Sequence, residues 1–478
     1  MYKASASVTL PTSIIGSLPR PSWYSASLGS QSFLEAMMNL RYREQYEDAV
    51  SVYLRAQETA GLDICTDGDA HFDEQISGMS WQSYPLTHMS GFSTTAEPTP
   101  YQMGAGAPRG HILHDFLEAR VLPKITGPVG PGNLEYTAMW KVAQRLTRKP
   151  VKFGTILPEL LAASVADEYY KDPVERIWAL SEALNSELND LADAGCPVIQ
   201  LEEPQIHMVP VRGKPFGKLD TGDLVKVFNN TVKGLRDKTE VWCHTCWGNP
   251  SQQRIFRDVQ SYQPTLAALN QVDADAITFE TCSSGTGDLK AIGEIIKDKK
   301  IVIGVIDHHT LQVERPDQVA ALIREALKYI PAERLMISSD CGMGREGMSR
   351  RHAAYKMVAK VLGTNIVRKE LGLPEAECLA ADPRFSLAAR ALWVILGWAT
   401  GPLSRRRRAG LRTPIRDVGR VSRRRNSPPL KSDGGLRCPA DRARWLKANP
   451  PYTPCCSSDM SRLVKSGKSA VATTLTIP

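Results

Sequence analysis

The sequence lacks three features that would place it in a specialised class of protein. Its first residues, MYKASASVTLPTSIIGSLPRP, contain no apolar run followed by a small-residue cleavage site, so we expect no secretion signal. The most apolar late stretch, residues 387–403, is broken by Arg390 and two glycines and is shorter than the roughly 20 apolar residues of a membrane span. Ten cysteines among 478 residues are too few for a disulfide scaffold. We therefore expect a cytoplasmic protein with reduced cysteines and no membrane partner.

Most of the chain also lacks the basic character that its net charge of +8 suggests. Residues 391–478 contain 14 Arg and 4 Lys against 4 Asp, a net charge of +14, which leaves residues 1–390 at −6. The late part shows neither helical nor strand periodicity, and high charge with few apolar residues predicts disorder. We expect a folded domain over residues 1–386 and a disordered, basic C-terminal tail over residues 387–478.

The folded part contains recurrent short apolar or β-branched runs separated by long amphipathic segments. Segments 173–195 and 315–331 carry apolar residues at steps of three and four, with a proline near each start, which is typical of helices. Strands that alternate with helices predict a parallel sheet, and eight such units close a (β/α)8 TIM barrel. The long interval 70–150 predicts an inserted segment near the barrel mouth. The expected strands are eight runs: 12–17, 62–69, 151–156, 198–204, 239–246, 276–281, 301–309 and 335–342.

Polar side chains cluster at the carboxyl end of these runs. In a TIM barrel those ends meet on one face, where catalytic groups lie. The residues at these ends include Ser17, Asp67, Asp69, Glu202, Glu203, His244, Cys246, Glu280, Asp307, His308, His309, Asp340 and Cys341. The pattern therefore predicts one functional site at that face.

A zinc site is the first chemical interpretation of these residues. His244 and Cys246 are two apart on a predicted strand, so both side chains leave the same side. Imidazole and thiolate together suit zinc, and the neighbouring strand ends offer Glu280 and Cys341 as further ligands. A thiol that binds such an ion is deprotonated and becomes a nucleophile. Taken alone, a His-x-Cys pair also fits ordinary packing, and Asp307, His308 and His309 also fit hydrogen bonding to loop backbone.

With these residues in view, the chain resembles the cobalamin-independent methionine synthase family, in particular its catalytic C-terminal barrel. The resemblance covers about residues 10–375 and none of the tail. It is carried, in order, by IIGSLPRP, VKFGTILPELLA, VIQLEEP, HTC, ITFET, GVIDHH, SDCGMGRE and VLGTNIVRKELG.

The resemblance implies residue roles as well as a fold. It implies a Zn²⁺ held by His244, Cys246, Glu280 and Cys341, and a substrate thiol that is most simply homocysteine. It implies that backbone from Ile15, Gly16 and Ser17 binds the homocysteine carboxylate, and that Asp69 and Glu202 bind its amine. It implies that His309 donates a proton. The expected reaction is methyl transfer from a methylated folate to homocysteine, giving methionine.

Two departures leave other functions open. Met208 stands where the family has a further glutamate, and the family's N-terminal half has no counterpart here. A related alternative is an enzyme resembling epoxyalkane:coenzyme M transferase, which adds a thiol sulfonate to an epoxide; Arg20 favours it, whereas Asp69 and Glu202 disfavour it. A non-enzymatic alternative is a structural-zinc barrel with a nucleic-acid-binding tail. Beyond Trp445 and Tyr452 the tail lacks interleaved aromatic residues, and no recognition fold is evident, so we expect no nucleic-acid partner.

Overall fold

The computed structural model describes most of the predicted folded domain. The described residues are 4–26, 28, 31–70, 80–94, 97–98, 121–202, 205–247, 261–344 and 348–382. The chain separates into two units, residues 1–402 and 403–478, and only the first contains described residues. The predicted tail 387–478 lies outside them.

A parallel sheet forms the centre of the described unit. Its strands follow one another in chain order around the sheet, and every neighbouring pair is parallel. This confirms the βαβ pattern predicted from the alternating runs. The strands are β1 (Cys65–Thr66), β6 (Val151–Ile156), β7 (Val198–Glu202), β8 (Glu240–His244), β9 (Ala276–Phe279), β10 (Lys300–Gly304) and β11 (Leu335–Ser338).

The run 12–17 occupies the eighth position without forming a regular strand. Thr12 makes a parallel bridge with Ile337 of β11. On its other side, the Thr12 carbonyl accepts from the backbone N–H groups of Asp63 and Ile64, at 3.0 and 3.1 Å, just before β1. This segment therefore hydrogen-bonds to both edges of the sheet, and the barrel closes through it.

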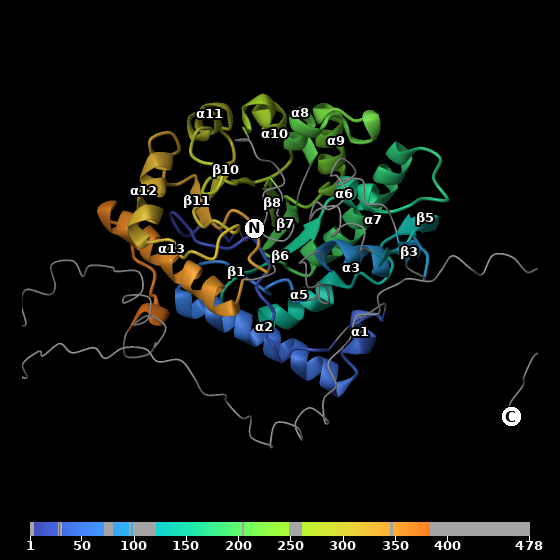
Figure 1. The fold of residues 1–478 in the computed structure, drawn as a ribbon, viewed down its shortest axis with the longest axis horizontal. Coiled ribbons are helices and arrows are strands. Elements are labelled where there is room, and N and C mark those ends of the chain that lie inside the picture. Colours follow the sequence, from blue (N-terminus) through green and yellow to red (C-terminus); the bar gives the residue numbers. More distant parts are fainter. Residues whose placement is uncertain are drawn as a thin grey trace, which may run out of the picture. The chain divides into compact units, whose positions relative to one another are not determined.

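Helices surround the strands, as Figure 1 shows. The predicted helix 173–195 is observed as α7 (Pro173–Asp193), which begins where the Asp172 side chain accepts from the backbone N–H of Val174. The predicted helix 315–331 is α12 (Pro316–Leu327). The other barrel helices include α2 (Leu40–Ala60), α6 (Pro158–Ser164), α9 (Thr221–Thr231), α10 (Leu266–Leu269), α11 (Leu289–Ile295) and α13 (Arg350–Glu370).

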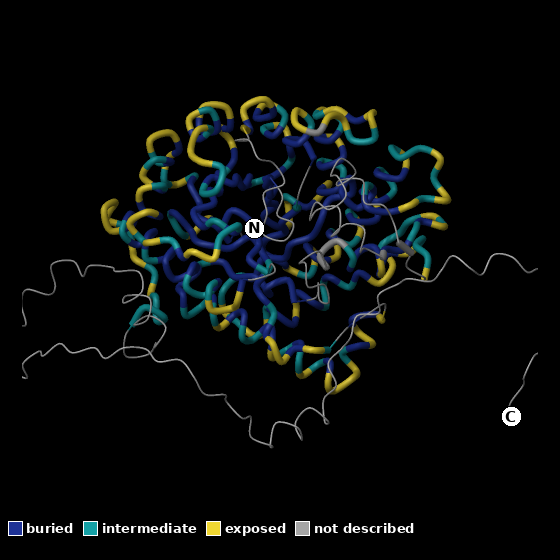
Figure 2. Tube along the Cα trace, in the orientation of Figure 1, coloured by how far each residue is buried: buried dark blue, intermediate teal, exposed yellow. Residues whose placement is uncertain are grey.

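Two apolar layers hold the barrel together. A small cluster inside it contains Trp242 and one residue from each of several other strands, among them Val198 and Met336. A far larger cluster fills the space between the strands and the helices. Figure 2 shows the buried centre and the exposed outer faces of the helices. Because alternate residues of a strand face opposite layers, the inward row of each strand leads directly to the polar groups at its carboxyl end.

The long connection between β1 and β6 contains its own short elements. Here β2 (Ser90–Phe92) pairs with β5 (Ile125–Gly130), and β3 (Glu97–Pro98) pairs with β4 (Val121–Leu122). They lie between α3 (Ser80–His88) and α5 (Tyr136–Arg145), so the predicted insertion is partly structured. Among the described residues, no helix is both long and apolar enough to span a membrane, and stretch 387–403 lies outside them.

Candidate metal centre

Three side chains from two strand ends converge in the barrel. His244 ends β8, Cys246 lies two residues later, and Cys341 lies just beyond β11. One potential ligand atom from each lies within 4.8 Å of the others. All three residues are buried, and the two sulfur atoms are 3.7 Å apart and are not joined in a disulfide. The predicted convergence of imidazole and two sulfurs is therefore present.

The spacing of the two sulfurs fits a tetrahedral metal ion. Zinc–thiolate bonds are about 2.3 Å long, so two thiolates on a tetrahedron stand about 3.8 Å apart. The observed 3.7 Å matches this edge and is far longer than a disulfide bond. The donor set and its spacing thus fit zinc without rearrangement of either cysteine.

Hydrogen bonds orient the ligands of this centre. His244 Nδ1 lies 2.6 Å from Thr278 Oγ1, and the same hydroxyl accepts from the backbone N–H of Thr245. This contact occupies Nδ1, so a metal ion would be bound through Nε2 of His244. The backbone of the second ligand is held as well: His207 Nε2 lies 2.6 Å from the carbonyl oxygen of Cys246. A second partner on a ligating imidazole fixes its tautomer and its direction.

The predicted fourth ligand, Glu280, is adjacent but lies outside the group of three. It is buried, and one carboxylate oxygen accepts from the backbone N–H of Trp247 at 2.9 Å. The other oxygen accepts from the Ser283 hydroxyl. The Asp340 carboxylate holds this loop by accepting from the backbone N–H groups of Thr281, Cys282 and Ser283. The structure therefore brings three predicted ligands together and holds the fourth beside them by hydrogen bonds.

The residues predicted for an amino-acid substrate lie next to this centre. Glu202 and His244 are directly paired across β7 and β8. Ser17 contacts the loop that carries Cys341: its carbonyl accepts from the Met343 N–H at 2.8 Å, and its hydroxyl accepts from the Gly344 N–H at 3.2 Å. A thiol group at the metal centre would thus lie beside Ser17 and Glu202. The residues predicted to bind the amino-acid part of the substrate, Ile15–Ser17, Asp69 and Glu202, are called the cradle below.

The cradle segments also contact one another. A methyl group added at Gly16 would lie 2.6 Å from Asp69 Oδ2, so only glycine allows this approach. Gln200 Nε2 donates to the Ile15 carbonyl at 3.0 Å and to Glu202 Oε1 at 2.7 Å. Ile15, Gly16, Asp69 and Glu202 therefore form one surface of the barrel lumen.

His309 is held by the acid two residues before it. Asp307 Oδ1 accepts from the His309 backbone N–H at 2.7 Å and lies 3.2 Å from His309 Nδ1. Burial acts to raise the pKa of Asp307, but the bonds from His309 outweigh it, and the net pKa lies below its usual value. Side chains of Asp307, His308 and His309 also form a compact group, with one nitrogen or oxygen of each within 4.8 Å.

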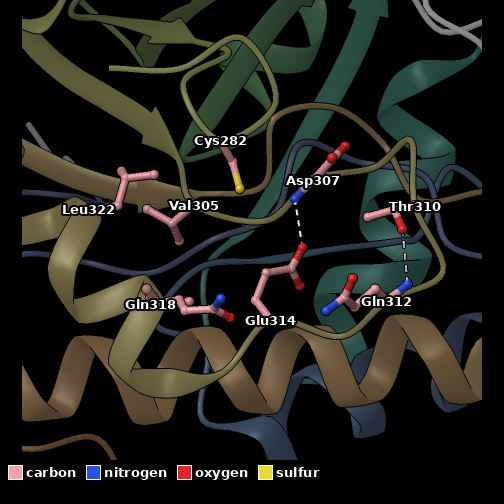
Figure 3. A pocket seen from close by; sticks show the side chains of 9 residues that line it. Cys282, Val305, Asp307, Thr310, Gln312, Glu314, Gln318 and Leu322 are labelled. Atoms are coloured by element: carbon pink, nitrogen blue, oxygen red, sulfur yellow. Dashed lines mark hydrogen bonds between the residues drawn. The ribbon is translucent and has the colours of Figure 1, made fainter. Parts of the chain in front are cut away.

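A cavity of about 270 Å³ opens beside this group. Figure 3 shows Cys282 and Asp307 among its lining residues, with Glu314 accepting from the Asp307 backbone N–H. Burial, followed by the charge of Asp340, raises the pKa of Cys282, so this thiol stays protonated. The cavity lining is Cys282, Val305, Asp307, Thr310, Gln312, Glu314, Gln318, Val319 and Leu322.

Several site residues were not predicted from the sequence. Thr278 lies two residues before Glu280, so the alternation of β9 places it on the same face and would have found it. Lys152 and Gln200 are inward-facing polar residues within apolar strands β6 and β7, a signal that was also available. His207 has no such signal, because it lies in the short helix η2 (Gln205–Met208).

Sequence and structure comparisons identify similar proteins. The family described as "Cobalamin-independent synthase, Catalytic domain" matches residues 120–362. Methionine synthase of Saccharolobus solfataricus is 28% identical over 368 residues, covering 76% of this chain and 96% of that protein. Methionine synthase of Sulfurisphaera tokodaii is 26% identical over 370 residues, covering 76% and 94%. A B12-independent methionine synthase from Shewanella sp. W3-18-1, solved with selenomethionine, has a similar fold, with a TM-score of 0.61, 24% identity and coverage of 76% and 99%.

Proposed function

This chain belongs to the cobalamin-independent methionine synthase family, and from that membership we propose that it transfers a methyl group from a methylated folate to the sulfur of homocysteine, giving methionine. The single observation that carries the proposal is the position of Glu202. This acid is paired across the sheet with His244 of the metal centre and is bridged by Gln200 to Ile15. A soft metal centre and an amino-acid cradle thus share one lumen.

We propose His244, Cys246 and Cys341 as zinc ligands and Glu280 as the fourth. Their donor types and the 3.7 Å sulfur spacing support zinc rather than a hard cation such as Mg²⁺. When bound, zinc would deprotonate the incoming thiol and keep it as a thiolate. Glu280 would have to exchange its bond to the Trp247 N–H for the metal, which makes it the ligand best able to leave.

The remaining roles fall to residues of the cradle. Asp69 and Glu202 would pair with the substrate ammonium, and backbone from Ile15 to Ser17 would bind its carboxylate. In the reaction a sulfur–carbon bond forms as a nitrogen–carbon bond of the donor breaks. His309 would supply the proton to the departing nitrogen. Its Nδ1 is held by Asp307, and among the described residues its Nε2 has no hydrogen-bond partner.

The alternative thiol-sulfonate chemistry has weaker support. Arg20, which favoured it, lies over the Tyr24 ring at 4.6 Å and donates to the Ala70 carbonyl. The two acids Asp69 and Glu202 line the proposed substrate site, where they would repel a sulfonate. The nucleic-acid alternative depends on the tail, which lies outside the described residues.

The relatives are informative about the family's N-terminal half, which has no counterpart in this sequence. Two proteins named methionine synthase are covered to 96% and 94% by this chain. Proteins of that name therefore exist with about the length of this barrel. The length of this barrel is thus no argument against formation of methionine.

The proposal is tested by product analysis of the zinc-loaded full-length chain. With homocysteine and methyltetrahydrofolate we expect methionine, detected by mass spectrometry, and none from a Cys246→Ser variant. A parallel reaction offers a thiol sulfonate and an epoxide. Thioether formation from the sulfonate without methionine formation would replace the proposal with the alternative, and no product in either reaction would reject both.

A further inference from the structure

A buried lysine and glutamine connect the two halves of the proposed substrate cradle. Lys152 of β6 is 1% exposed and Gln200 of β7 is fully buried. Lys152 Nζ donates to the Ile14 carbonyl at 2.8 Å and to Gln200 Oε1. The same ammonium lies 4.6 Å from the centre of the Trp242 ring. These contacts satisfy the lysine within the barrel and leave its position well defined.

Its neighbours determine which way the Gln200 amide points. The Ile15 carbonyl at 3.0 Å and Glu202 Oε1 at 2.7 Å are acceptors, so the amide NH₂ must face them. The amide oxygen then faces Lys152, which donates to it. Each N–H of Gln200 therefore has one acceptor, and an inverted amide would lose every one of these bonds.

The two acceptors belong to the parts of the proposed site that would bind the two charged groups of the substrate's α-carbon. Glu202 would bind the α-ammonium, and the segment from Ile15 would bind the α-carboxylate. The spacing between them sets which molecules can engage both. Gln200 fixes that spacing through a single rigid amide. A second buried lysine, Lys360, donates to the carbonyl of Ser13 and supports the same segment.

We propose that Lys152 and Gln200 are positioning residues that set the distance between Glu202 and the Ile15–Ser17 backbone and thereby select thiols that carry an α-amino acid group. This inference rests on the proposed function, because it assumes that the cradle binds a thiol substrate. The positioning of the cradle by Lys152 and Gln200 would explain selectivity for the amino-acid part of the thiol, which the metal centre cannot supply. The metal recognises sulfur, whereas Lys152 and Gln200 make recognition of the amino-acid end depend on one amide.

The test compares two thiols that differ only in the amino group. Homocysteine and 4-mercaptobutanoate have the same thiol and carboxylate, and the second lacks the α-ammonium. Binding of each to the zinc-loaded full-length chain is measured by calorimetry, together with zinc content. We expect the wild-type chain to prefer homocysteine by roughly tenfold or more, the worth of one charge-assisted contact. Gln200→Met, similar in length but without polar atoms, should lose most of that preference and still bind 4-mercaptobutanoate with nearly unchanged affinity.

A second variant and a matched control keep the result interpretable. Lys152→Met removes the donor that holds Gln200 Oε1 and the Ile14 carbonyl, so the amide and the segment beside it lose their anchor and the preference should fall in the same direction. This variant serves as the test if Gln200→Met does not fold. Gln144→Met removes a half-buried glutamine of α5 that bonds only to backbone of residues 147–151, and it should keep the wild-type preference.

The outcomes separate this inference from the proposed function. A wild-type preference that persists in folded Gln200→Met overturns the positioning role, and so does an equal loss of affinity for both thiols, which indicates a merely structural residue. Neither result affects methionine formation by the wild-type chain, measured in parallel. Equal binding of the two thiols by the wild-type chain would overturn the cradle itself.

Discussion

At the scale of single residues, Thr278 orients His244, a ligand of the proposed metal centre, without being a ligand itself. Its hydroxyl holds His244 Nδ1 at 2.6 Å. Thr278→Val keeps the shape and removes the bond, so the imidazole loses its fixed direction. We expect zinc affinity to fall by roughly 10–100-fold, as is usual when such a partner is removed. Competition with a chelator of known affinity measures it.

A threonine at the other end of the neighbouring strand provides the control. Thr239 precedes β8 and donates to the Cys196 carbonyl at 2.7 Å, away from the centre. Thr239→Val should reduce stability without changing zinc affinity. Equal affinities in wild type and Thr278→Val would show that the hydroxyl does not orient the imidazole.

Glu159 makes stability depend on pH. It is buried in the first turn of α6, and burial raises its pKa from 4.5 to about 7, although the N–H of Gln205 acts against this. The native state therefore holds a proton that the unfolded state releases above its lower pKa. Stability contributed by the protonated form is present below about pH 4.5 and is lost as pH rises through about 7.

Glu159→Gln tests this directly, because glutamine stays neutral. At pH 8 the variant should exceed the wild type in unfolding free energy by up to about 3 kcal/mol, and at pH 5 the difference should fall to about 1 kcal/mol or less. Urea unfolding at both pH values measures the difference. A difference that is the same at pH 5 and pH 8 would show that Glu159 does not titrate between them.

At the scale of elements, α13 supports the loop that carries His309. Lys356 of this helix is fully buried, and its ammonium donates to the carbonyls of Asp307 and Gln312 and to Glu314. Lys356→Met removes all three bonds and leaves buried acceptors unpaired, which should cost about 2–4 kcal/mol of stability. The loosened loop should lower kcat for methyl transfer with zinc content unchanged.

The control lies on the same helix. Lys369 is exposed near the end of α13, so Lys369→Met should leave both stability and kcat at wild-type values. A folded Lys356→Met variant with wild-type kcat would show that the loop does not need this tether.

The elements themselves were largely predictable from periodicity. The run 151–156 is observed as β6 with the same limits, and α7 ends within two residues of the predicted end. The irregular form of run 12–17 was harder to predict. Pro11, just before it, has no N–H to donate to a sheet, and the bridge that the structure describes for this segment is the one at Thr12. Its role depends on contacts with residues 63–64 and 337, which no local pattern reveals.

The candidate site was predictable to the level of strand ends but not of side-chain contacts. Alternation along a strand predicted that the side chains of His244 and Cys246 leave the same side. Their ligand atoms do lie within 4.8 Å of each other, although β8 already ends at His244. The sequence could not show that Glu280 bonds to the Trp247 N–H in this structure. That contact depends on the path of two loops, which tertiary packing decides.

At the scale of the whole molecule, we propose that residues 1–386 contain everything needed for the centre. The barrel closes through residue 12, and all the proposed site residues lie between 15 and 341. A chain truncated after residue 386 should keep its zinc content, its unfolding free energy and its kcat. Side-by-side metal analysis and turnover measure this, and loss of either would assign a role to residues 387–478.

The most direct test of the central claim is metal analysis of the purified full-length chain. In the proposed centre, the imidazole and two thiolates that lie at and just beyond the ends of β8 and β11 share one ion. We expect about one zinc per chain in the wild type. We expect loss of most of that zinc in both Cys246→Ser and Cys341→Ser. Full zinc content in both variants, or a wild-type chain that binds no zinc when the metal is supplied, would contradict the central claim.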